Sequence, residues 1–179
     1  MSSVNKESIH ASNAGFIFDN NFSDVDTKGG LVNVIQINLH KAKLANKGLE
    51  NFCDNSPHIF CVQEPYLFKD MLNYAPKNLL QYYKKGTEAR AALLSSRDLP
   101  LWFADQLSTR DMAVAVLKSK GKTIIIVSLY CDHNLNGVIP NELYTLLLYL
   151  EEGGFEGGLL ICADSNAWST LWGSESTNP

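Results

Sequence analysis

The apolar run over residues 159–163 stops abruptly at Asp164, and it constrains the fold more than any other feature of this sequence. Its length, with Gly157 and Gly158 before it and polar residues after it, predicts a buried β-strand. Alternate side chains of a strand point the same way, so we expect Asp164 and Asn166 to project together from its C-terminal end. An Asx-type turn after an ordinary strand explains the same pattern without any function.

Two other apolar runs end in polar groups in the same way. Residues 58–63 predict a strand that ends at Glu64, where Pro65 stops strand pairing because it has no N–H. Residues 31–39 alternate in polarity and predict a third strand with Asn38 near its end. Mg²⁺ prefers oxygen ligands and often takes only one or two protein carboxylates. Polar groups at three strand ends therefore predict a Mg²⁺ site, with ordinary strand-end polarity as the alternative.

The remaining periodicities indicate a mixed α/β protein. Apolar residues at helical spacing predict helices over 41–53 and 140–152. Residues 71–83 are interrupted by Pro76, and we expect a loop with a short helix there. Four successive strands joined by short connections predict an antiparallel meander, with the very apolar segment 124–127 at its centre. Those four strands are expected over residues 89–95, 99–103, 112–118 and 123–130.

Composition limits the classes of protein that this chain can belong to. With 179 residues, 45% of them hydrophobic and 19% charged, one globular domain is expected. No run approaches the ~18 apolar residues of a membrane span, so no membrane partner is expected. Residues 1–30 are rich in Ser, Asn and Asp and end in two glycines, which predicts a flexible leader before a domain over 31–179. The four cysteines stand singly and predict free buried thiols in a reducing compartment, without a zinc site.

The formal net charge of -4 argues against a protein that coats nucleic acid through bulk electrostatics. It does not argue against a nuclease, because a metal site itself collects acidic groups. A basic face, if there is one, must be local, and ordinary solvated surface is the alternative. The candidates for such a face are Lys41, Lys43, Lys47, Lys84, Lys85 and Arg90.

Several motifs occur in a fixed order along the chain. They are Gln36-Ile37-Asn38-Leu39-His40, Gln63-Glu64-Pro65-Tyr66, residues 108–114, Ala163-Asp164-Ser165-Asn166-Ala167 and Leu171-Trp172-Gly173-Ser174. Their order and spacing resemble the endonuclease domain of non-LTR retrotransposons, a member of the endonuclease/exonuclease/phosphatase superfamily. The resemblance covers about residues 31–179. It implies a DNase I-like, four-layer α/β/β/α sandwich of two facing, mostly antiparallel sheets.

The resemblance also implies a function. Such domains nick DNA by Mg²⁺-dependent phosphodiester hydrolysis to prime reverse transcription, inside the cell and in the nucleus, as part of a longer reverse-transcriptase polyprotein. By position, Asn38 and Glu64 would belong to the metal site, with Glu64 the ligand. Tyr130 would contact the scissile phosphate. Asp164 would orient or activate the attacking water, and Asn166 would bind phosphate or position that water.

Two departures from the family pattern qualify this resemblance. The family commonly has Gly-Asp-Phe-Asn-Ala-His, where this chain has Ala163, Ser165 and Trp168 at the differing positions. The family also continues beyond the position of Pro179 into further strands, another metal-site Asp and a closing Ser-Asp-His. We therefore expect a C-terminally truncated domain with impaired activity. The alternatives are a non-catalytic remnant that binds nucleic acid or protein, and a phosphomonoesterase of the same superfamily.

Overall fold

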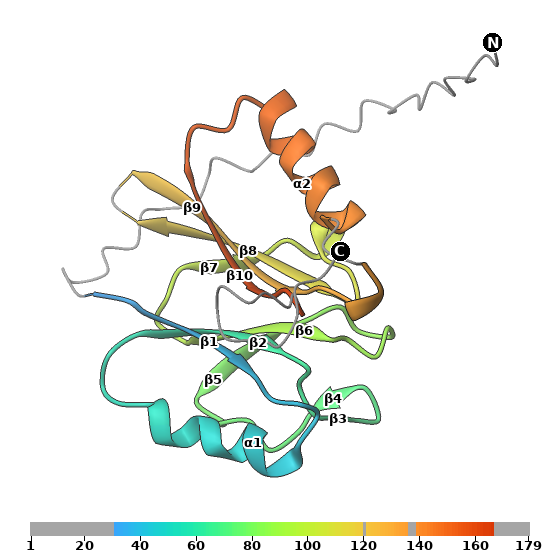
Figure 1. Ribbon diagram of the computed structural model, residues 1–179. Helices are drawn as coiled ribbons and strands as arrows, with labels where there is room; N and C mark the ends of the chain where they lie inside the picture. The colour runs from blue at the N-terminus through green and yellow to red at the C-terminus, as the bar shows by residue number, and fades with distance from the viewer. Residues whose placement is uncertain (1–30, 120, 136–138, 167–179) are drawn as a thin grey trace, which may run out of the picture.

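The computed structural model describes residues 31–119, 121–135 and 139–166. The expected leader over residues 1–30 and the segment 167–179, with Trp168 and Trp172, lie outside the described residues. The predictions for those two segments therefore stay predictions. The described residues form two four-stranded sheets that face each other and a small two-stranded hairpin (Figure 1).

The first sheet has the strand order β1-β2-β6-β5, and the second has the order β10-β9-β8-β7. In each sheet one pair is parallel, β1 with β2 and β9 with β10, and the other pairs are antiparallel. The first sheet contains β1 (Asn33–Asn38), β2 (His58–Gln63), β5 (Leu79–Tyr82) and β6 (Ala91–Ser96). The second contains β7 (Leu101–Phe103), β8 (Met112–Ser119), β9 (Lys122–Tyr130) and β10 (Gly158–Asp164). The hairpin pairs β3 (Leu67–Phe68) with β4 (Met71–Leu72).

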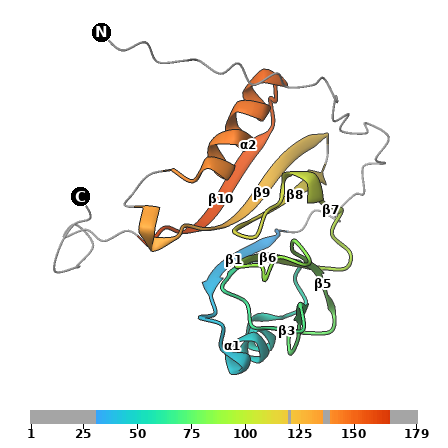
Figure 2. The same ribbon diagram turned by 90° about the vertical axis from the view of Figure 1, so that its right-hand side faces the viewer.

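Helices cover the outer faces of the two sheets (Figures 1 and 2). Helix α1 (Lys43–Gly48), extended by the 3₁₀ turn η1 (Leu49–Phe52), lies on the first sheet, and α2 (Asn141–Glu152) lies on the second. Two further 3₁₀ turns are η2 (Asp105–Leu107) and η3 (His133–Leu135). Within the described part of the chain, no helix is long and apolar enough to cross a membrane. The predicted four-layer α/β/β/α sandwich and both predicted helices are confirmed.

Apolar side chains fill all three spaces between these layers. Every residue of β2 is buried, and the Ile59 and Cys61 side chains face the second sheet while Phe60 and Val62 face α1. Burying a side chain such as Phe60 completely stabilises the fold by about 1.5–3 kcal/mol. The core between the sheets also contains Ala91, Leu93, Ala113, Ala115, Ile126 and Cys162. These layers place the strand ends of both sheets at one common edge.

Two predictions about the middle of the chain are wrong. The four strands there do not form one meander, because β6 pairs with β2 and β5 while β7, β8 and β9 belong to the other sheet. A short connection usually forms a hairpin within one sheet, but residues 97–100 connect β6 in the first sheet with β7 in the second. Residues 71–83 contain β4 and β5 and no helix. The predicted central place of residues 124–127 is confirmed, since β9 lies between β8 and β10.

Strand β10 is formed as predicted, but it is not a buried strand. Among the described residues it pairs only with β9, at the edge of its sheet. Leu159, Leu160 and Ile161 remain 38%, 37% and 37% exposed. An apolar run predicts an extended segment, but it does not reveal which neighbours cover that segment.

Polar contacts, all buried except that of Gln36, tie the two sheets together close to this common edge. The Gln63 side chain donates from Nε2 to Ser128 Oγ at 3.0 Å and to the Cys162 carbonyl at 3.1 Å. The Ser128 hydroxyl donates to the Val62 carbonyl at 3.0 Å, and Gln36 Nε2 donates to the Ala163 carbonyl at 2.7 Å. A buried polar group must find a partner or lose stability, so these bonds fix β10 against β1 and β2.

Candidate catalytic site

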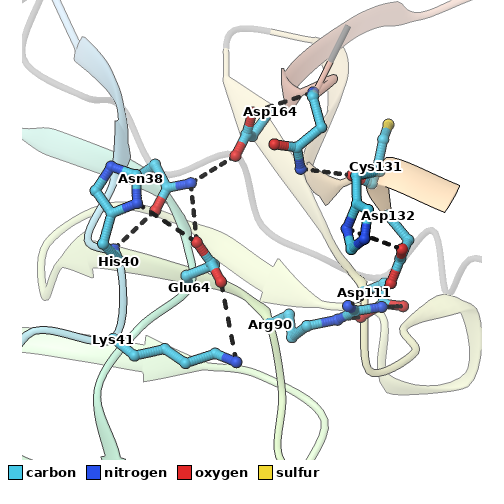
Figure 3. A network of polar contacts seen from close by, with 11 residues as sticks. Asn38, His40, Lys41, Glu64, Arg90, Asp111, Cys131, Asp132 and Asp164 are labelled. Atoms are coloured by element: carbon cyan, nitrogen blue, oxygen red, sulfur yellow. Dashed lines mark hydrogen bonds and ion pairs between the residues drawn. The ribbon is translucent and has the colours of Figure 1, made fainter. Parts of the chain in front are cut away.

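Three polar side chains from three strand ends meet at the common edge of the two sheets (Figure 3). Asn38 is the last residue of β1, Glu64 follows β2, and Asp164 is the last residue of β10. The Asn38 amide nitrogen donates to Glu64 Oε2 at 3.3 Å and to Asp164 Oδ2 at 2.5 Å. Residues 126 positions apart in the sequence are thus in direct contact. The structure brings together the three side chains from which the sequence predicted a Mg²⁺ site.

The backbone at Glu64 turns sharply so that its carboxylate reaches Asn38. Glu64 has φ +48°, in the left-handed region that residues with a side chain rarely adopt. Such a conformation costs on the order of 1 kcal/mol or more, and the surrounding structure must hold it in place. The Glu64 N–H donates to the Arg90 carbonyl at 2.8 Å, and the Glu64 carbonyl accepts from the Lys41 N–H at 2.8 Å. Strain of this kind is common where a side chain is aimed at a functional site.

Basic groups lie on the open side of the Glu64 carboxylate. His40 Nδ1 is 3.6 Å from Oε2, and Lys41 Nζ is 3.9 Å from Oε1. Both basic side chains are exposed, whereas the Glu64 side chain is 19% exposed, so these contacts are weak, and the contact with His40 is an ion pair only when His40 is protonated. The His40 N–H also donates to Asn38 Oδ1 at 2.7 Å. The Asn38 nitrogen thus donates to both carboxylates, while its oxygen accepts one backbone bond and keeps a second lone pair.

The Asx-type turn predicted as the alternative explanation of the Asp-x-Asn pattern is present, and β10 ends at Asp164, so Asn166 does not continue the alternation of the strand. Asp164 Oδ1 accepts the Asn166 N–H at 3.3 Å, which is the Asx-type turn. Asp164 Oδ2 faces Asn38. The Asn166 amide nitrogen donates to the Cys131 carbonyl at 2.7 Å, so this side chain holds the chain after β9 instead of joining Asn38.

Tyr130 ends β9 directly opposite Asp164, and its side chain is nearly buried. Burial raises the pKa of its phenol above the ordinary value of 10.0, and the negative charge of Glu64 raises it further. The Arg90 charge and a hydrogen bond with Asn166 oppose this rise without cancelling it. The Tyr130 hydroxyl is therefore protonated at neutral pH and can donate a hydrogen bond to an anion.

Arg90 belongs to the same edge, and neither the predicted local basic face nor its alternative, ordinary solvated surface, describes it. Its side chain is only 14% exposed. Nε and Nη2 donate to the two oxygens of Asp111 at 2.6 Å each, and Nη1 donates to Asp132 at 2.7 Å. The guanidinium also lies over the Tyr130 ring, 4.5 Å from its centroid. The signal that could have revealed this network is that Asp111 precedes β8 and Asp132 follows β9, so both flank strand ends.

No family model and no curated protein matches the chain. Among solved structures, the chain is similar to the endonuclease domain of TRAS1, a telomere-specific non-LTR retrotransposon, with 26% identity, a TM-score of 0.59 and 80% of this chain covered. The chain has the endonuclease/exonuclease/phosphatase fold. The predicted resemblance to the endonuclease domains of non-LTR retrotransposons is confirmed. A humanized D. rerio TDP2 with 14 mutations shares this fold at 12% identity and a TM-score of 0.50, over 79% of this chain. The chain spans 63% of the length of the TRAS1 domain and 66% of that of TDP2.

The oxygen atoms of Asn38, Glu64 and Asp164 are the type of ligand that a hard divalent cation prefers, and two of these three side chains carry a negative charge. The Glu64 and Asp164 carboxylates approach one neutral amide, so their two negative charges are only partly compensated. Mg²⁺ binds through one or two carboxylates and completes its shell with water and phosphate. Among the described residues, no three or more His, Cys, Asp or Glu side chains form a cluster that could hold a metal ion. Water and phosphate would therefore have to supply the remaining ligands.

Proposed function

We propose that this chain is a Mg²⁺-dependent DNA endonuclease domain that nicks DNA by phosphodiester hydrolysis, and that the nick primes reverse transcription of a retrotransposon. The observation that carries the proposal is the contact of Asn38 with both Glu64 and Asp164 at the edge where the two sheets meet. The similarity to the TRAS1 endonuclease domain supports DNA as the substrate. Action in the nucleus as part of a longer polyprotein belongs to the same proposal.

Each residue has a separate task in this proposal. Glu64 and Asn38 would hold Mg²⁺, which would neutralise charge on the phosphate and the leaving oxygen. Asp164, fixed by the Asn38 N–H, orients the attacking water and takes up its proton. Tyr130, protonated at neutral pH because its pKa is raised, donates a hydrogen bond to a phosphate oxygen. Asn166 holds the chain after β9 through Cys131 and positions the water beside Asp164.

Exposed basic and aromatic residues beside Glu64 suit the backbone of DNA. The Lys43 ammonium lies 4.2 Å from the centre of the Tyr74 ring, and the Tyr66 ring is 6.1 Å from that of Tyr74. Lys41 and Lys43 are both exposed and add local positive charge on a chain whose formal net charge is -4, and His40 adds to it only when protonated. Phosphate groups are attracted to such a surface, and aromatic faces can stack on bases.

The test is the nicking of supercoiled plasmid with and without Mg²⁺. We expect nicked circles only with Mg²⁺, and a rate about 10²–10⁴-fold lower for Asp164→Ala, the size of effect that a positioned base has in catalysis. Glu64→Ala is expected to abolish nicking at low Mg²⁺ concentration. Exposed Asp98→Ala and Glu151→Ala are matched controls that retain the wild-type rate.

Other outcomes point to other functions. Nicking that survives Asp164→Ala and Glu64→Ala rejects the assigned roles. A gel shift with DNA but no cleavage indicates a nucleic-acid-binding module without catalysis. Release of inorganic phosphate from a phosphomonoester, without plasmid nicking, indicates a phosphomonoesterase of the same superfamily.

A further inference from the structure

We propose that Arg90 is a positioning residue that holds the Tyr130 ring at the cleavage site and acts through Tyr130 without touching DNA. The proposal rests on the function proposed above, because it assigns Tyr130 to the phosphate. It goes beyond that function by naming the support on which Tyr130 depends. Arg90 lies directly before β6 in the first sheet, whereas Tyr130 ends β9 in the second.

The guanidinium of Arg90 is unsuited to binding a phosphate directly. It forms a bidentate pair with Asp111, at 2.6 Å for each bond, and a third bond with Asp132 at 2.7 Å. Two carboxylates against one cation leave this group with a net charge of about -1, which repels an incoming phosphate. The side chain is also mostly buried. The positive charge of Arg90 is thus balanced by Asp111 and Asp132 within the protein.

The same bonds aim the guanidinium at Tyr130. Its central carbon lies 4.5 Å from the centre of the aromatic ring, within the range of a cation–π interaction. Asp111 contributes twice, because its side chain holds Arg90 while its backbone carbonyl accepts the Tyr130 N–H at 2.8 Å. The planar fork of an arginine keeps its orientation in a bidentate pair, which a lysine cannot do. The ring of Tyr130 therefore lies against a surface of fixed orientation.

Arg90 also connects Tyr130 to the strained turn that carries Glu64. The Arg90 carbonyl accepts the Glu64 N–H at 2.8 Å, and the Arg90 N–H donates to the Arg110 carbonyl at 2.7 Å. Its backbone therefore supports Glu64, while its side chain supports Tyr130. One residue sets the relative position of the proposed metal ligand and the proposed phosphate contact across the two sheets.

A double-mutant cycle tests whether Arg90 acts through Tyr130. Single-turnover nicking rates are measured for the wild type, Arg90→Met, Tyr130→Ala and the double variant. We expect Arg90→Met to lower the rate roughly tenfold, the size of a partly buried cation–π contact. The same change in a Tyr130→Ala background should lower the rate less than about twofold, because the group it positions is gone. Equal effects in both backgrounds would overturn the proposal.

DNA affinity separates positioning from direct contact. Since Arg90 does not touch DNA, Arg90→Met should leave the Kd for uncleaved duplex and its salt dependence unchanged. A weaker Kd with a salt slope smaller by about one would show a direct phosphate contact and contradict the proposal. Arg90→Lys, which keeps the charge without the fork, should recover only part of the nicking rate.

A third measurement needs no activity and so distinguishes failure of this inference from failure of the proposed function. In protein labelled with ¹³C-tyrosine, Tyr130 ring signals are assigned through Tyr130→Phe. We expect Arg90→Met to shift them and to speed ring flipping, and Lys84→Met, which removes the separate Lys84–Asp105 ion pair, to leave them unchanged. Unchanged Tyr130 signals in folded Arg90→Met would overturn the proposal. If that variant does not fold, Arg90→Lys and Asp132→Asn give the same comparison.

Discussion

Asn38 holds two carboxylates with one side-chain amide. Its nitrogen has two N–H groups, and it donates to Glu64 and to Asp164. An aspartate at this position would place a third negative charge among the same oxygens, whereas the neutral amide brings the two acids together without adding to their repulsion. The residue type at position 38 therefore explains how one side chain contacts both carboxylates at this edge.

Asp132 predicts how stability changes with pH. The Arg90 guanidinium, and then the Asn134 N–H, lower the pKa of its carboxyl from the ordinary 3.8 to about 2. A carboxyl whose pKa is lower in the folded state stabilises the protein above pH 3.8, and this contribution is lost as the pH falls to about 2. Urea unfolding should therefore show wild type more stable than Asp132→Asn at pH 5, with the difference shrinking toward pH 2. A difference that is constant between pH 5 and pH 2 would contradict this assignment, and exposed Asp98→Asn is the control.

At the scale of elements, the sequence predicted most strands and both helices because their patterns are local. Glu64 and Asp164 were recognised as candidates for the same reason, since each ends an apolar run. Sheet membership was not predictable in this way, because residues 97–100 can turn a hairpin or cross between sheets equally well. The burial of Arg90 was not predictable, because its partners Asp111 and Asp132 are 21 and 42 residues away. An arginine gives no local sign of burial.

The hydrogen bonds of Gln63, which connect β2 to the second sheet, lead to a prediction about stability. Gln63 is fully buried, and its amide nitrogen satisfies Ser128 Oγ and the Cys162 carbonyl. Gln63→Ala should lower the free energy of unfolding by about 1–3 kcal/mol, because the Cys162 carbonyl loses its buried donor. Exposed Gln81→Ala in β5 should change it by less than about 0.5 kcal/mol. Urea denaturation measures both, and equal effects would show that the inter-sheet bridge does not stabilise the fold.

At the scale of the whole molecule, the two facing sheets turn separate strand ends into one site. Because β1 runs parallel to β2 and β9 runs parallel to β10, the C-terminal ends of these four strands lie at the same edge of the molecule. The cross-sheet bonds of Gln36 and Gln63 keep those ends in register. Packing of the layers, more than any local motif, therefore brings Asn38, Glu64 and Asp164 into contact.

The proposed function depends on Mg²⁺ held by Glu64 and Asn38 beside Asp164, and a Mg²⁺ titration followed by NMR tests this most directly. The side-chain amide signals of Asn38 report on both carboxylates, because its nitrogen donates to each. We predict that Mg²⁺ shifts these signals in a saturable way and that Glu64→Gln weakens binding at least about tenfold, as loss of a charged ligand implies. Asp164→Asn, which removes no ligand, should weaken binding less. Mg²⁺ binding that is as tight in Glu64→Gln as in the wild type, with unmoved Asn38 signals, would contradict the account.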